Sequence, residues 1–306
     1  MSLVLRGSMV AMVTPFRDDR IDETALQGLI ETQITAGSSA VVPCGTTGES
    51  ATLSHDEHDR VIELTVQAAR GRTLVIAGTG SNNTREAIRL TKHAKEAGAD
   101  AALLISPYYN KPTQRGLYLH FKAIADSVDL PLVIYNIPGR TAVNIEPDTF
   151  GQLAGVKNIV AVKESSGNLE QMRRILAVTQ GKLTLLSGDD ALTYDVLSIG
   201  GTGVISVVAN LVPGDVAALV RAFEQGRRDE AKRWHEKLLP LSQAMFLETN
   251  PSPVKTAMAM LGWIQQDVRL PLCEVTEETR GRIRQALEAY GLLGSGGRAK
   301  TARAAA

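Results

Sequence analysis

The sequence predicts a (β/α)8 TIM barrel, an α/β fold, followed by a C-terminal helical appendage. Three observations support this prediction. Short apolar runs rich in β-branched residues alternate with helix-length periodic segments, eight such runs occur at nearly even spacing, and the remainder of the chain has only helical patterns. A doubly wound sheet is disfavoured because the turn after the first run, Thr14-Pro15-Phe16, lacks the glycine fingerprint of that fold.

The eight runs have the composition of parallel strands that are buried on both faces. They cover residues 9–13, 40–43, 74–77, 101–105, 132–135, 159–163, 183–186 and 203–208. Capping residues begin several of the intervening helices, namely Asp22, Ser54 with Glu57, and Asn83 with Glu86. Glycines end others, at Gly37, Gly71 and Gly98. Strand, helix and turn signals therefore repeat as βα units.

Beyond the eighth run, helical periodicity covers residues 213–225, 229–246, 254–261 and 277–292. The first of these helices closes the barrel, and the others form the appendage. We therefore expect a catalytic barrel over 1–225, a helical region over 226–293, and a Gly/Ala/basic tail over 294–306 that is frayed.

Composition narrows the class of protein. Lys+Arg and Asp+Glu both total 33, so the formal net charge is zero, which disfavours nucleic acid or an anionic membrane as the main partner. The two cysteines, Cys44 and Cys273, form no CxxC motif and fit a reducing compartment. No apolar run is long enough to span a bilayer. We expect a cytoplasmic protein.

Lys163 is the most informative single residue. It ends the sixth predicted strand, where burial would be costly for a charged amine. Burial favours the neutral form of a lysine, and a neutral amine at a strand end is what a Schiff-base enzyme requires. The alternative is a lysine that extends its head group into solvent. The position alone leaves these alternatives evenly matched.

Other strand ends add groups suited to carbonyl chemistry, and barrel active sites lie at this rim. Tyr135 ends the fifth strand, next to Lys163 in a barrel, and can shuttle protons. Thr46 and Thr47, in Gly45-Thr46-Thr47-Gly48-Glu49-Ser50, offer hydroxyls and backbone N–H groups for a carboxylate. Arg140 offers a bidentate fork for a second carboxylate. Each residue alone has a structural explanation, and their shared rim favours a site.

A metal site is not expected. His55 and His58 have a superficially ligand-like i, i+3 spacing, but they follow the Ser54 cap and are predicted to lie in a helix, away from the strand-end rim. The other histidines also fall in helical segments.

Together these motifs resemble the dihydrodipicolinate synthase (4-hydroxy-tetrahydrodipicolinate synthase) family, within the N-acetylneuraminate lyase group of class I aldolases. The resemblance runs from about residue 7 to residue 293. The matching stretches are Val13-Thr14-Pro15-Phe16, residues 45–50, Pro107-Tyr108-Tyr109-Asn110-Lys111-Pro112, residues 135–141, Val162-Lys163-Glu164, Ser187-Gly188-Asp189 and Asn250-Pro251-Ser252-Pro253-Val254-Lys255.

The resemblance implies a reaction and roles for residues. Lys163 would form a Schiff base with pyruvate and Tyr135 would shuttle protons, linked through Thr46 to Tyr109 of the partner subunit. Thr47 and the backbone of Ile205 would hold the pyruvate carboxylate, with Gly188 also in the substrate site. Arg140 would bind L-aspartate 4-semialdehyde. The resemblance also implies that the reaction is the first committed step of lysine (diaminopimelate) biosynthesis and that it needs no external cofactor. It further implies that the protein is a homotetramer made of two tight dimers.

A second set of residues matches the feedback site of that family, which implies inhibition by L-lysine. The set consists of Ser50, Ala51, His55, His58, Gly80, Asn82, Glu86 and Tyr108. Two of these have simpler explanations, because Glu86 would complete a capping box with Asn83 and His55 would be an exposed residue at a helix start.

Three other functions compete with this one. The nearest is another pyruvate-dependent aldolase, such as an N-acetylneuraminate or 2-keto-3-deoxy sugar-acid lyase, against which Arg140 and the paired threonines argue. A phosphate-binding barrel isomerase would require a glycine-rich loop after strand seven or eight, whereas Gly200-Gly201-Thr202-Gly203 precedes the eighth strand. A binding barrel without catalysis is the third.

Overall fold

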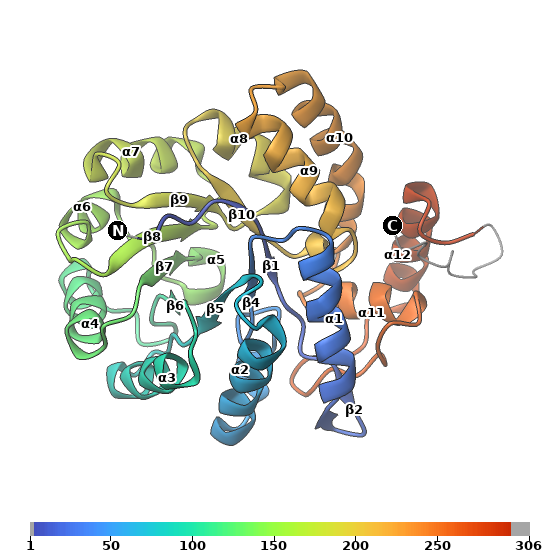
Figure 1. Ribbon diagram of the computed structural model, residues 1–306, viewed down its shortest axis with the longest axis horizontal. Coiled ribbons are helices and arrows are strands. Elements are labelled where there is room, and N and C mark those ends of the chain that lie inside the picture. The colour runs from blue at the N-terminus through green and yellow to red at the C-terminus, as the bar shows by residue number, and fades with distance from the viewer. Residues whose placement is uncertain (1–2, 295–306) are drawn as a thin grey trace.

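The computed structural model describes residues 3–294, and in them eight parallel strands close into a barrel (Figure 1). The strands are paired in the order β1-β10-β9-β8-β7-β6-β5-β4. Their bounds are β1 Gly7–Ala11, β4 Ala40–Val42, β5 Leu74–Gly78, β6 Ala101–Ile105, β7 Leu132–Asn136, β8 Ile159–Glu164, β9 Thr184–Ser187 and β10 Gly203–Ser206. The predicted TIM barrel is confirmed. A hairpin that was not predicted, β2 (Phe16–Arg17) with β3 (Arg20–Ile21), follows the first strand.

Helices surround the barrel and continue beyond it. They are α1 Glu23–Thr35, α2 His55–Ala69, α3 Thr84–Ala97, α4 Gln114–Ser127, α5 Pro138–Thr141, α6 Pro147–Leu153, α7 Leu169–Thr179, α8 Thr193–Ser198, α9 Pro213–Glu224, α10 Arg228–Ala244, α11 Ser252–Met260 and α12 Glu277–Tyr290. Asp22 caps α1 through its side chain, and Ser54 and Glu57 form the predicted capping box of α2. These caps fix where the helices leave the strand-end loops.

Side chains alternate between the barrel interior and the helix layer. Along β8, Ala161 belongs to the interior apolar cluster, with Tyr135, Leu186 and Ile205, whereas Val162 packs with the surrounding helices. The interior is apolar, so a polar residue on an inward position stands out. Lys163 takes the next inward position after Ala161, at the end of the strand.

Three strands end earlier than predicted. β4 is shorter by one residue, and at the ends of β1 and β10 a side chain takes over the hydrogen bonding of the backbone. β1 stops at Ala11, because the N–H of Val13 donates to the Asn210 side chain at 3.2 Å. β10 stops at Ser206, because the N–H groups of Val207 and Val208 donate to the Asp190 carboxylate at 2.9 and 3.0 Å. A buried carboxylate thus ends the strand in place of a turn residue.

The C-terminal helices share the largest apolar core with the barrel. That core joins Val216 of α9 to Leu241 of α10, Val254 of α11 and Leu287 of α12, and α11 and α12 lie together on one side of the barrel (Figure 1). The division at residue 225 remains a prediction. The expected frayed tail over 294–306 lies, apart from residue 294, outside the described residues. No helix within the described part of the chain is long and apolar enough to cross a membrane.

Candidate active site

Lys163 and Tyr135 lie side by side at the ends of adjacent strands. They are register partners in the β7–β8 pairing, and Lys163 Nζ lies 4.1 Å from the centroid of the Tyr135 ring. Both side chains are buried, with Lys163 only 6% exposed. The structure therefore brings together the predicted nucleophile and the predicted proton shuttle inside the rim of the barrel.

Gly188, at the end of β9, leaves the space that Lys163 occupies. A Cβ built on Gly188 would lie 2.9 Å from Lys163 Cε and 3.1 Å from Cγ, so the lysine side chain would have to move. Its N–H donates to the carbonyl of Glu164 at 2.9 Å, which fixes the loop against β8. This packing explains why a glycine stands at position 188, and its substrate role stays a prediction. Ile205 is the inward residue of β10 and is 1% exposed.

The loop after β4 presents the two threonines. Its internal hydrogen bonds use the N–H groups of Gly48, Glu49 and Ser50. Among the described residues, these bonds leave the N–H groups of Thr46 and Thr47 without an acceptor. Thr47 is buried, and its hydroxyl accepts a hydrogen bond from Asn250 Nδ2 at 3.0 Å. A carboxylate placed here would find free backbone donors.

Asn250 belongs to the candidate site through its contacts, although its sequence context predicts no role for it. Besides its contact with Thr47, its carbonyl accepts a hydrogen bond from Arg140 Nη2 at 3.1 Å. Arg140 lies in the single turn of α5, and its side chain is otherwise open to the cavity. One residue from the C-terminal region therefore connects the two groups predicted to bind carboxylates. Asn250 lies in the stretch 250–255 that resembles the family, and that resemblance assigned no role to it.

A buried ion pair supports the same loop from below. Glu49 Oε1 lies 2.5 Å from Lys255 Nζ of α11, and both side chains are fully buried. The other carboxylate oxygen, Oε2, accepts from the N–H of Arg269 at 3.1 Å. Burial lowers the pKa of Lys255, and the charge of Glu49 opposes that shift. The pair ties the threonine loop to the C-terminal helices.

A cavity of about 410 Å³ opens beside this rim, and it extends from the threonine loop to the residues predicted to bind lysine. Its lining includes Thr46, Arg140, Ser50, Ala51, His55, His58, Gly80, Glu86 and Tyr108. Asn82 is not in the lining, and its side chain instead donates to the carbonyl of Tyr108 at 3.2 Å. A smaller cavity of about 30 Å³ lies between Tyr135, Thr46, Ser50 and Gly80.

Two expectations about residues on one wall of the larger cavity, which includes His58 and Glu86, are wrong. His58 is not remote from the strand ends, because its Nε2 donates to the carbonyl of Gly78, the last residue of β5, at 2.8 Å. Burial also lowers the pKa of His58. Glu86 does not complete a capping box with Asn83. Its carboxylate instead accepts from Ser81 and lies 2.9 Å from His55 Nε2, and these contacts, that of Ser81 first, lower its pKa.

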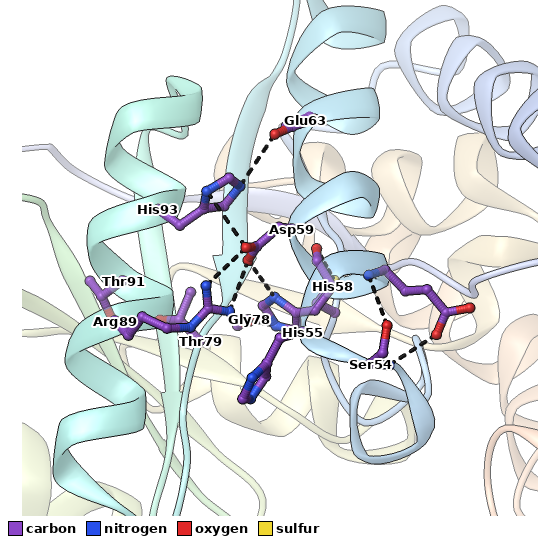
Figure 2. A network of polar contacts seen from close by, with 12 residues as sticks. Ser54, His55, His58, Asp59, Glu63, Gly78, Thr79, Arg89, Thr91 and His93 are labelled. Atoms are coloured by element: carbon purple, nitrogen blue, oxygen red, sulfur yellow. Dashed lines mark hydrogen bonds and ion pairs between the residues drawn. The ribbon is translucent and has the colours of Figure 1, made fainter.

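Behind this wall, Asp59 joins α2 to α3 (Figure 2). Arg89 donates to both carboxylate oxygens of Asp59, at 2.9 and 3.1 Å. His93 Nδ1 and His58 Nδ1 lie 3.8 and 3.9 Å from the same carboxylate. The network holds the two helices that carry His58 and Glu86 at a fixed separation.

Tyr109 does not reach Thr46 within its own chain. It is 89% exposed and has a φ of +73°, a conformation that non-glycine residues rarely adopt. The side chains of Asn82 and Asn110 fasten the turn, by donating to the carbonyls of Tyr108 and Asn82 at 3.2 and 2.9 Å. The chain therefore holds a tyrosine away from its own surface.

Metal-binding side chains do not converge in the described residues, where no group of three or more His, Cys, Asp and Glu forms a candidate metal site. The groups that do converge are an amine, a phenol, hydroxyls and a guanidinium. A lysine buried against a tyrosine at the rim of a (β/α)8 barrel fits a class of protein, the lyases that act on carbonyl compounds.

Comparisons with known proteins identify the family within that class. The model of the dihydrodipicolinate synthetase family matches residues 4–290, and the chain belongs to this family. It is 55% identical over 291 residues to the 4-hydroxy-tetrahydrodipicolinate synthase of Syntrophus aciditrophicus, covering 95% of this chain and 100% of that one.

Solved structures agree with this assignment. The chloride-inhibited dihydrodipicolinate synthase of Acinetobacter baumannii, in complex with pyruvate, has a TM-score of 0.93 and 43% identity over 95% of this chain and all of that one. The enzyme of Cyanidioschyzon merolae with lysine bound has a TM-score of 0.91 and 42% identity, covering 94% of this chain and 99% of that one. The chain is thus a lyase of this family.

Proposed function

We propose that this chain condenses pyruvate with L-aspartate 4-semialdehyde to give 4-hydroxy-tetrahydrodipicolinate, with Lys163 as the nucleophile. The observation that carries the proposal is the buried Lys163 amine, 4.1 Å from the centre of the Tyr135 ring. The names of the relatives support the same reaction.

The chemistry assigns a task to each group. The Lys163 amine adds to the keto carbon of pyruvate, and loss of water gives an iminium. Loss of a proton from the methyl group then gives an enamine, whose carbon bonds to the aldehyde carbon of the second substrate. Tyr135 carries protons to and from these intermediates through Thr46. The substrate's own amine finally displaces Lys163 and closes the ring, so the reaction needs no external cofactor.

Carboxylate recognition separates this reaction from those of the sugar-acid lyases. Thr47 and the backbone at Ile205 would hold the pyruvate carboxylate, and Arg140 would hold that of the semialdehyde. Asn250 positions both sides through its contacts with Thr47 and Arg140. The position of Arg140 next to the pyruvate site favours an aldehyde substrate that carries a carboxylate close to its reacting carbon.

Borohydride reduction in the presence of pyruvate tests the nucleophile. We expect mass spectrometry of peptides to place one reduced pyruvate on Lys163, because borohydride fixes the iminium as a stable amine. Lys163→Met should remove the adduct, whereas Lys157→Met, at a loop position before β8, should keep it. An unmodified Lys163 in the wild-type chain would rule out Schiff-base chemistry.

We also propose that L-lysine inhibits the enzyme by binding in the cavity beside the rim. Glu86 is a carboxylate with a lowered pKa on that wall, so it would be charged at neutral pH and could pair with an ammonium group. The lysine-bound relative supports this ligand. The cavity also contacts Thr46, which gives a bound amino acid a short route to the proton relay.

The inhibition test uses Glu86→Gln. We expect wild-type turnover to fall at millimolar L-lysine, and the half-inhibiting concentration to rise about tenfold or more in the variant, because a charge-assisted bond is lost. Glu63→Gln is the control, since Glu63 is on α2 and outside the cavity lining. Wild-type rates that do not respond to millimolar lysine would contradict the proposal.

The exposed Tyr109 supports a multimer in which the partner's Tyr109 completes the relay from Tyr135 and Thr46. We propose a homotetramer of two tight dimers, with this interface in each dimer. A chain that sediments as a monomer in sedimentation velocity and is fully active in the assay would contradict this proposal.

A further inference from the structure

Ser165 carries a buried hydroxyl that no protein group satisfies. Its Oγ is inaccessible to solvent and has no hydrogen-bond partner among the described residues. Leaving such a group unpaired is unfavourable, so its position calls for a physical explanation. Ser165 follows the proposed nucleophile by two positions, so the question is where its hydroxyl lies relative to Lys163.

The backbone fixes Ser165 on the inward side of the barrel. Its N–H donates to the carbonyl of Asn136 at 2.9 Å, and the N–H of Gly188 donates to the carbonyl of Glu164 at 2.9 Å. These bonds continue the pairing of β8 with β7 and β9 past the end of the strand. Because strand residues alternate between faces, Ser165 projects to the same side as Lys163.

Gly188 provides a reference point for both side chains. A Cβ at that position would lie 1.9 Å from Ser165 Oγ and 2.9 Å from Lys163 Cε. The hydroxyl and the methylene that carries the amine therefore border the same small space. Only a glycine leaves that space open.

Two other neighbours of Lys163 offer no free hydrogen-bond donor. The Tyr135 ring lies against Nζ, and the interior below contains the apolar side chains of Ala161 and Leu186. The Thr47 hydroxyl already accepts from Asn250. Ser165 lies two positions beyond Lys163, just past the end of β8 at Glu164, and so toward the strand-end rim of the barrel.

We infer that Ser165 is a further catalytic residue that donates a hydrogen bond to the carbonyl oxygen of the aldehyde substrate. The inference rests on the proposed Schiff base at Lys163. When the enamine carbon bonds to the aldehyde carbon, the carbonyl π pair moves to the aldehyde oxygen and the nitrogen lone pair re-forms the iminium. The oxygen then takes up the proton that Tyr135 carries and becomes the alcohol, while the Ser165 hydroxyl keeps its own proton. A donor fixed beside the amine would stabilise that oxygen as its charge develops.

Ser165→Ala separates this role from a role in pyruvate chemistry. We expect borohydride trapping of pyruvate on Lys163 and the KM for pyruvate to stay at wild-type values, and kcat/KM for the aldehyde to fall about tenfold. Ser165→Cys, with a similar size and a weaker donor, should be intermediate. Ser8→Ala removes another buried, unpartnered hydroxyl, far from this rim on β1, and should change neither value.

Each outcome decides between the hypotheses. Lost trapping in Ser165→Ala alone would overturn the inference, because the hydroxyl would then act on the lysine or on pyruvate. Unchanged aldehyde kinetics in a variant that traps pyruvate would also overturn it. Absent trapping in the wild-type chain would instead refute the proposed function on which it rests. If Ser165→Ala does not fold, as judged by circular dichroism, a lower kcat/KM for the aldehyde in Ser165→Cys supports the inference, and an unchanged value overturns it.

Discussion

Tyr135→Phe is expected to reduce turnover by roughly two to four orders of magnitude, the usual effect of removing a positioned acid–base group. Phenylalanine keeps the ring that lies 4.1 Å from Lys163 Nζ, so the packing around the amine survives and only the hydroxyl is lost. Steady-state assays with pyruvate and the semialdehyde would measure the loss.

Tyr194→Phe is the matched control for this experiment. Its ring packs against Phe223 and His235 at the helix layer, away from the strand-end rim. We expect wild-type turnover in this variant. Activity of Tyr135→Phe within a few-fold of wild type would show that the proton-shuttle role is wrong, whatever the control gives.

The barrel and the centre of the site were predictable because they depend on local patterns. Parallel strands that are buried on both faces appear in the sequence as apolar runs, and the rule that barrel sites lie at strand ends selects Lys163 and Tyr135. Their contact follows from topology, since consecutive strands of a barrel are neighbours. The structure confirms that adjacency in the β7–β8 register.

Residues that act through distant contacts were not predictable in this way. Asn250 contacts Thr47 across 203 positions of sequence, and no local pattern indicates which loop it meets. The conformation of Glu49 is a similar case, because its positive φ of 54° is unusual for a glutamate and is held by Lys255 and Arg269. Such conformations are set by tertiary partners and not by residue type.

The corrections at His58 and Glu86, which line the cavity, have the same origin. The sequence spacing of Asn83 and Glu86 satisfies a capping box, but Ser81 and His55 compete for the carboxylate and bind it. His55 comes from a different helix, α2, so the sequence around α3 contains no sign of it. Local rules therefore fail where partners from outside a helix draw a side chain away from its cap.

Lys255→Met is expected to lower the free energy of unfolding by about 3–5 kcal/mol, because it leaves the Glu49 carboxylate buried without its cation. The ammonium also lies 4.2 Å from the centre of the Phe16 ring, so methionine keeps an apolar contact there while the charge is lost. Urea unfolding of the variant and the wild-type chain would measure the difference.

A second substitution identifies the cause of that loss. Lys255→Met combined with Glu49→Gln should be more stable than Lys255→Met alone, since the unpaired charge is gone, and the coupling is read from the double-mutant cycle. Lys122→Met breaks an exposed pair with Asp126 on α4 and should change stability little. Because Glu49 belongs to the loop that presents Thr46 and Thr47, the single variant should also raise the KM for pyruvate. A Lys255→Met chain as stable as Lys122→Met would mean that the buried pair does not hold this loop to the C-terminal helices.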